Sequence, residues 1–275
     1  MGEGGGEEKP ITEHVIELLE TLRKIIIYNI AFILLLFLLP SSPNISNGYV
    51  PLIFTLMQRV KNDMLEFRAN PVAAPIAGVL GVNGSEVILI ANGWFDSLIG
   101  ALYLAALLAV IVMGPVTIYL VYRYVEPGLY EHEKRAVKKY LAAIFGLFTA
   151  GIVYAYYIIM PIMFAVAVWL TVIGGAKPIF SIQDFYNTIL IGCLSTGVMF
   201  MLPLFLLLLA RLGFITSETL RKNWRIVTFA TFAVTAIITP DPTPISMMAL
   251  SIPFVALYTL SLYLVEKAEK KAAQR

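Results

Sequence analysis

The chain has 275 residues, of which 59% are hydrophobic and only 14% are charged, with a formal net charge of +2. Soluble domains carry roughly 25% charged residues, so this composition, with a mean hydropathy of +0.81, excludes an ordinary soluble protein. Apolar runs of spanning length recur and the alternating pattern of membrane strands is absent, which predicts an all-α integral membrane protein.

The N-terminal region shows no export signal. Residues 1–10, MGEGGGEEKP, have no basic start, apolar core or cleavage site, and their acidic, glycine-rich composition is typical of a disordered cytosolic tail. Residues 11–24 then predict an amphipathic cytosolic helix that leads into the first apolar run, 25–40. The loop at 41–96, which we expect outside, contains PLIFTLMQRVKNDMLEFR, whose apolar residues recur at helical spacing and predict a helix lying flat on the outer surface.

Five more apolar runs follow, at 98–122, 140–176, 185–210, 226–238 and 245–265. The run at 140–176, the third of the six, is too long for one simple span, and we interpret it as one span broken or tilted at Pro161 and continuing onto the membrane surface. The run at 226–238, the fifth of the six, is too short, at 1.5 Å per residue, to cross roughly 30 Å of hydrocarbon. Either its neighbours shield it or the bilayer thins around it. The membrane domain at 25–265 is therefore predicted to have six spans.

The distribution of basic residues supports six spans over seven. With six spans, Arg and Lys concentrate on the side that receives both termini, and only Arg59, Lys61, Arg68 and Lys177 fall on the other side. The positive-inside rule then places both termini in the cytosol. Seven spans would move the basic tail at 266–275 outside, which disfavours that count.

Enzyme and ion-transport signatures are absent from the sequence. There is no zinc-protease, nucleophile-elbow or phosphate-loop motif, and the single cysteine, Cys193, excludes a site of several thiolates. His14 and His132 each have a nearby glutamate, so a two-His, two-Glu metal site is conceivable, but solvated histidines are the simpler interpretation. We expect no enzyme activity, cofactor or metal. No isolated charge stands in mid-membrane, which disfavours a pump or ion-coupled transporter.

The cytosolic connections carry two acidic patches. One lies in the N-terminal helix, where Glu13, Glu17 and Glu20 fall within one or two turns and Glu13 and Glu17 are one turn apart on a face. The other lies in YVEPGLYEHEKRAVKKY, which supplies Glu131 and Glu133. If both patches face one cavity, they form a receptor for guanidinium groups, which pair with carboxylates bidentately. The alternative is a solvated belt of charges at the membrane interface.

Three stretches resemble the TatC subunit of the twin-arginine protein translocase. ITEHVIEL is similar to the family pattern T-x-H-L-x-E-L-R, and GPVTIYLVYRYVEPGLYEHEKR is similar to P-V-x-x-Y-Q-x-W-x-F-x-x-P-G-L-Y-x-H-E-R-R. LPLFLLLLARLGFITSETLRKNWRIVTFATFAVTAIITPDPTPIS resembles a long signature that ends in I-I-T-P-P-D-x-x-S-Q. The resemblance runs in order over residues 11–265.

This resemblance implies a glove-like bundle in the cytoplasmic membrane that receives signal peptides with paired arginines and exports folded proteins with the proton-motive force. It places signal-peptide binding at Glu17 and Glu133, with Tyr124, Pro127 and Tyr130 shaping the adjoining tip. Its partners would be signal peptides, small single-span TatA/TatB-type subunits, the lipid bilayer and further copies in a receptor complex, with no nucleic acid. A small-molecule or ion transporter is the alternative function.

Departures from the family pattern concern mainly the partner site. Leu19 replaces a common arginine, and Met201 stands where the fourth span commonly carries an intramembrane glutamate. Thr243 occupies a usual aspartate position and Met247 replaces a glutamine, so contact with the small partner is expected to differ around these three positions. Helix breaks that shape the cavity are expected at three prolines, although tolerated kinks would explain them equally: Pro115, Pro161 and Pro203.

Overall fold

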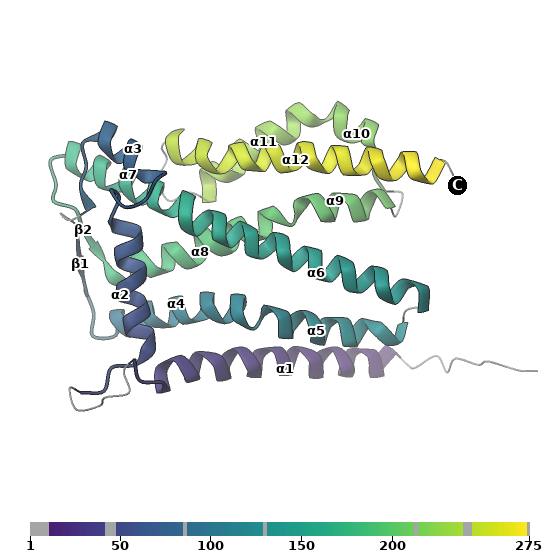
Figure 1. Cartoon of the computed structure of the whole chain (residues 1–275), viewed down its shortest axis with the longest axis horizontal. Coiled ribbons are helices and arrows are strands. Elements are labelled where there is room, and N and C mark those ends of the chain that lie inside the picture. The colour runs from purple at the N-terminus through teal and green to yellow at the C-terminus, as the bar shows by residue number, and fades with distance from the viewer. Residues whose placement is uncertain are drawn as a thin grey trace, which may run out of the picture.

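The computed structural model describes residues 11–41, 48–84, 87–128, 131–211, 214–238 and 244–273. The predicted disordered tail and Thr243 lie outside these residues. The long helices run side by side along the longest axis of the molecule, and shorter elements cover one end of them (Figure 1). The described start of α1 and the end of α12 are both at the opposite end, on opposite sides of the bundle.

The N-terminal lead-in and the first apolar run form one continuous helix, α1 (Ile11–Leu38). The helix predicted in the next loop is confirmed as α2 (Leu52–Leu65), which crosses the ends of the long helices (Figure 1). It buries Ile53, Met57 and Met64 against the main core. The Tyr186 hydroxyl of α8 donates a buried 2.7 Å hydrogen bond to the Met57 carbonyl, which fixes α2 to the bundle.

The second apolar run is bent in the middle. Helices α4 (Asp96–Val112) and α5 (Gly114–Val125) meet at 54°, and Pro115 occupies the first turn of α5. A proline is tolerated in a first turn because that N–H group has no intrahelical partner. After α5, the short 3-10 helix η3 (Glu126–Gly128) turns the chain toward α6.

The third apolar run forms one long helical segment, as predicted, rather than a hairpin. It consists of α6 (Glu131–Tyr154), the π-helical turn η4 (Ala155–Ile159) and α7 (Met160–Ile173). The change in hydrogen-bonding pattern comes directly before Pro161, whose nitrogen cannot donate to the carbonyl four residues earlier. The predicted break at this proline is therefore a local π turn within a continuous segment.

The fourth run comprises α8 (Ile182–Phe200) and α9 (Leu202–Arg211), with Pro203 buried at the start of α9. Helices α6 and α8 cross closely at Gly151 and Gly197, where a Cβ atom added to Gly151 would lie 2.8 Å from the Gly197 Cα atom. Small residues at such a crossing let two membrane helices approach without side chains between them. This contact is central to the main core of the bundle.

The C-terminal third packs around a second, smaller core. It contains α10 (Ser217–Lys222), α11 (Trp224–Ile238) and α12 (Pro244–Ala273), and its core is centred on Leu207, Leu220, Tyr258 and Val265. Tyr258 donates a 2.8 Å hydrogen bond to the Leu220 carbonyl. The backbone N–H and hydroxyl groups of Ser217 both donate to the Glu269 carboxylate. These bonds hold α10 against α12.

The covering elements at the other end include α3 (Ala73–Leu80) and two parallel strands, β1 (Ile88–Ile90) and β2 (Ile179–Ser181). Hydrogen bonds join α2 and the α2–α3 connection at this end to the π turn. The Tyr156 hydroxyl donates to Asp63 Oδ2 at 2.9 Å, and Asn70 Nδ2 donates to the Tyr157 carbonyl at 3.0 Å. The covering elements are thus bonded to the long α6–α7 segment.

Four described helical segments are long and apolar enough to cross a membrane, and the bent α4–α5 pair would make a fifth span. Helix α11, the short predicted span, has 15 residues and falls below the length of a simple span. The count of six spans therefore stays a prediction, whereas a helical bundle with several helices long and apolar enough to span a membrane is confirmed.

Candidate functional site

A groove of about 530 Å³ lies between α1 and α5, which pack side by side (Figure 1). It combines acidic, basic, aromatic and apolar side chains. The α1 residues that line it are Glu17, Glu20, Thr21, Lys24 and Tyr28, and the residues from α5 and η3 are Val116, Tyr119, Leu120, Arg123, Tyr124 and Pro127.

The two helices run in opposite directions along the groove, because α1 leaves the end of the bundle that α5 approaches (Figure 1). Each lines it over eleven residue steps, or about 16 Å at 1.5 Å per residue. Glu17 and Glu20 therefore lie at the same end as Tyr124 and Pro127. At the other end Tyr28 faces the apolar start of α5, so the groove changes from acidic to mainly apolar along its length.

Hydrogen bonds and one weak ion pair lie along the groove and next to it. The Thr21 hydroxyl donates to the Glu17 carbonyl at 2.9 Å, inside α1. The Lys24 Nζ atom is 4.0 Å from Glu20 Oε2, and both side chains are more than half exposed, so solvent weakens their attraction. On α5, the Tyr122 hydroxyl donates to Glu126 Oε1 at 3.3 Å.

The groove gathers three of the five predicted signal-peptide residues: Glu17, Tyr124 and Pro127. Tyr130 lies outside the described residues, and Glu133 lies in the first turn of α6, where its side chain is not described. The same holds for the side chains of His14 and His132. Whether Glu133 shares a cavity with Glu17 therefore stays a prediction.

Sequence reasoning placed Glu20 in the same acidic patch as Glu17 but missed most of the remaining lining. Lys24 and Tyr28 follow Glu20 at helical spacing on α1, so a continuous helix through residue 28 would have placed them on the same face. Tyr119 and Arg123 are likewise one turn apart on α5. The missing signal was the helix pairing, which decides which face of each helix is covered.

A second space, of about 520 Å³, lies between α1, α4, α5 and α6 and is almost entirely apolar. We call it the apolar chamber. Met201 lines it, together with Phe145 and Phe148 of α6. The position where the family commonly has an intramembrane acid thus belongs to an apolar wall here. Met247, the other described member of the predicted partner region, is half-buried in α12.

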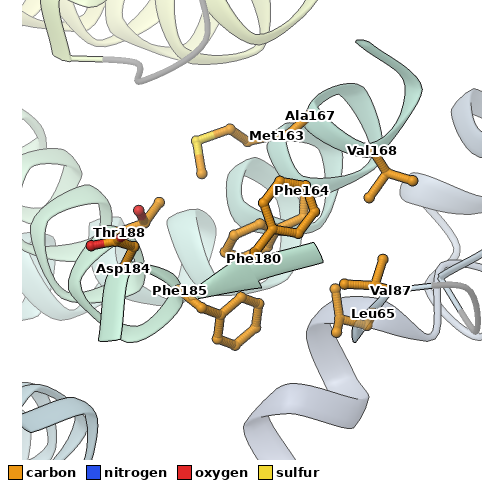
Figure 2. A pocket seen from close by; sticks show the side chains of 10 residues that line it. All are labelled: Leu65, Val87, Met163, Phe164, Ala167, Val168, Phe180, Asp184, Phe185 and Thr188. Atoms are coloured by element: carbon orange, nitrogen blue, oxygen red, sulfur yellow. The ribbon is translucent and has the colours of Figure 1, made fainter. Parts of the chain in front are cut away.

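A third cavity, of about 160 Å³, lies under the covering elements (Figure 2). Phe164 stacks on Phe185 with ring centroids 4.6 Å apart, and Leu65 and Val87 close one side. Apart from Asp184 and Thr188 its walls are apolar. It offers little polar chemistry for recognising a ligand, so the α1–α5 groove is the candidate site.

Comparisons with known proteins agree with the fold. The family model for the Sec-independent protein translocase protein (TatC) matches residues 13–253. The chain is 26% identical over 267 residues to TatC of Carboxydothermus hydrogenoformans, covering 96% of this chain and 97% of that protein. It is 29% identical over 180 residues to TatCy of Bacillus subtilis, covering 66% and 70%.

A crystal structure of a twin-arginine translocase receptor, TatC, shares the fold with a TM-score of 0.65 at 24% identity, covering 93% of this chain and 99% of that one. These findings give no support to the alternative of a small-molecule transporter. The family model, the full-length relative and the shared fold lead to one conclusion: this chain belongs to the TatC family, a membrane-embedded component of the Sec-independent, twin-arginine protein translocase.

Proposed function

We propose that this chain is the subunit that binds signal peptides with paired arginines, and that the α1–α5 groove is where it does so. The observation that carries the proposal is the acidic end of the groove, where Glu17 and Glu20 lie beside Tyr124 and Pro127. A partly buried carboxylate suits a guanidinium, which offers it two parallel N–H donors. Aromatic rings beside the carboxylates can also attract a cation through their faces.

The mainly apolar end of the groove supports the same proposal. A signal peptide carries an uncharged apolar stretch after its basic residues. With arginines at Glu17, that stretch would extend toward Tyr28, Val116 and Leu120. The groove thus presents carboxylates and then apolar side chains in the same order in which the peptide presents its arginines and then its apolar residues.

The wider mechanism follows from the family. The chain would have six spans with both termini in the cytosol of a cell whose cytoplasmic membrane it spans, and the proton-motive force would drive export. Small single-span TatA/TatB-type subunits would dock near Met201, Thr243 and Met247. Several copies would assemble into a receptor complex, with signal binding converted into recruitment of the small subunits.

The test measures binding of an Arg-Arg signal peptide and its Lys-Lys counterpart to the purified protein in detergent. Glu17→Gln keeps the size of the side chain but removes its charge, and we expect it to weaken Arg-Arg binding. Losing hydrogen bonds to a charged group costs about 1.5 to 3 kcal/mol, or roughly ten- to hundredfold in affinity. Glu133→Gln tests the second predicted carboxylate in the same way.

Glu66→Gln is the matched control, because Glu66 is an exposed glutamate at the end of α2, far from the groove. It should leave the affinity unchanged. Equal binding of both peptides, with no effect of Glu17→Gln, would mean that these acids form only a solvated belt. Substrate flux through liposomes containing this chain alone would instead favour the transporter alternative.

A further inference from the structure

The α1–α5 groove contains two cations that recognition of arginines does not need. Lys24 lies one turn beyond Glu20 on α1, and Arg123 lies one turn before Pro127 on the approaching α5. Lys24 is two turns, or about 10 Å, beyond Glu17. Both cations therefore stand between the acidic end of the groove and its mainly apolar end.

Their positions on opposing walls follow from the antiparallel pairing of the helices. Measured from the acidic end, Arg123 is about 6 Å along the α5 wall and Lys24 about 10 Å along the α1 wall, at 1.5 Å per residue. A ligand lying along the groove must pass both. Beyond them the walls are Tyr28, Tyr119 and the aliphatic residues of α5, with no further charged side chain among the described lining.

Neither cation is neutralised strongly within the groove. Lys24 pairs with Glu20 at 4.0 Å, and both side chains are largely exposed, so this ion pair contributes little. Arg123 is exposed. A cationic group that moved past Glu20 would lose the attraction of the carboxylates and meet two like charges, which disfavours it in any partly desolvated site.

We propose that Lys24 and Arg123 determine the register of the bound signal peptide. They confine its arginines to Glu17 and Glu20, and they exclude a peptide with a further cation at the depth of the two side chains. The groove thereby selects a basic pair followed by an uncharged stretch, rather than basic peptides in general. This inference rests on the proposed function, since it assumes that arginines bind at the acidic end.

The test is a lysine scan of an Arg-Arg peptide, in which one Lys replaces successive residues of the uncharged stretch and Gln at each position serves as the uncharged comparison. Binding is measured to the wild type and to the Lys24→Gln/Arg123→Gln double variant. In the wild type we expect the affinity of the Lys peptides to pass through a minimum at one position of the scan, where it is about tenfold lower than that of the matching Gln peptide. An exposed charge pair changes affinity by up to about fivefold, and here two cations act together. In the double variant the minimum should disappear.

Lys222→Gln provides the control for general electrostatics, because Lys222 is exposed on α10, away from the groove. It should leave the minimum in place. An unchanged scan in the double variant, or loss of the minimum in Lys222→Gln, would overturn the inference. Binding of the unmodified peptide tests the proposed function independently of the register. If that peptide binds and its binding depends on Glu17 while the lysine scan is flat, only the register proposal fails.

Discussion

Asn70 is predicted to stabilise the fold by repairing a hydrogen bond that Pro161 cannot make. Pro161 has no N–H group for the carbonyl four residues earlier, that of Tyr157. Asn70 Nδ2 donates to this carbonyl at 3.0 Å, across 87 residues of sequence. Its Oδ1 atom accepts from the N–H groups of Val72 and Ala73, at 2.9 and 3.0 Å, where α3 begins.

The two roles of Asn70 can be separated by substitution. Asn70→Ala removes both and should cost about 2 kcal/mol, from about 1 for the lost contacts at the helix start and about 1 for the lost donor. Asn70→Asp keeps the Oδ1 acceptor but replaces the donor with a carboxylate oxygen that repels the Tyr157 carbonyl, so it should cost more than the about 1 kcal/mol of the lost donor alone. In a Pro161→Ala background the backbone regains an N–H group for the Tyr157 carbonyl, and Asn70→Asp should cost less.

The assay is equilibrium unfolding in detergent, followed by the reaction of a thiol dye with Cys193. This residue is the single cysteine of the chain and is fully buried, so its reactivity reports loss of the main core. The double-mutant cycle between Asn70→Asp and Pro161→Ala should give a coupling of about 1 kcal/mol. If Asn70→Asp lowers the free energy of unfolding equally in both backgrounds, then Asn70 does not replace the donor that Pro161 lacks for the Tyr157 carbonyl.

Three further predictions use the same assay. Tyr186→Phe leaves the buried Met57 carbonyl without its 2.7 Å donor and should cost about 1 to 3 kcal/mol, so an unchanged stability would contradict this anchor of α2. Gly151→Ala should destabilise strongly, because its Cβ would clash with α8, whereas Gly146→Ala on the same helix meets nothing within 4 Å and should be neutral or stabilising. Ala167→Val should raise stability by about 0.5 to 2 kcal/mol by filling part of the 160 Å³ cavity (Figure 2), and a loss would show that the cavity cannot accept two methyl groups.

The long helices were predictable because uninterrupted apolar runs are a strong local signal, and the same holds for α2, whose apolar residues recur at helical spacing. The π turn before Pro161 was predicted only as an unspecified break. Its details depend on donors from Asn70 and on the contact of Tyr156 with Asp63, which lie far away in sequence. No local sequence pattern predicts such hydrogen-bonded pairs.

Part of the candidate site was likewise predictable from the sequence, and part depended on helix packing. Motif resemblance selected Glu17, Tyr124 and Pro127, and the structure brings them into one groove. Lys24 and Arg123 were counted only as basic residues of the cytosolic side. Their place in the groove depends on how α1 rotates against α5, and that rotation is determined by packing between helices rather than by either sequence alone.

The same two helices separate two spaces of different chemistry. At 100° per residue, the α1 positions of the groove, 17 to 28, point about 150° away from those of the apolar chamber, 25 to 30, and the positions on α5 divide likewise. Charge recognition and apolar accommodation are therefore placed on opposite sides of one helix pair. Substitutions at Glu17 should change peptide affinity without altering the chamber. Substitutions at Met201 should change the chamber, and the docking proposed there, without altering recognition of arginine, because no residue is shared between the two linings.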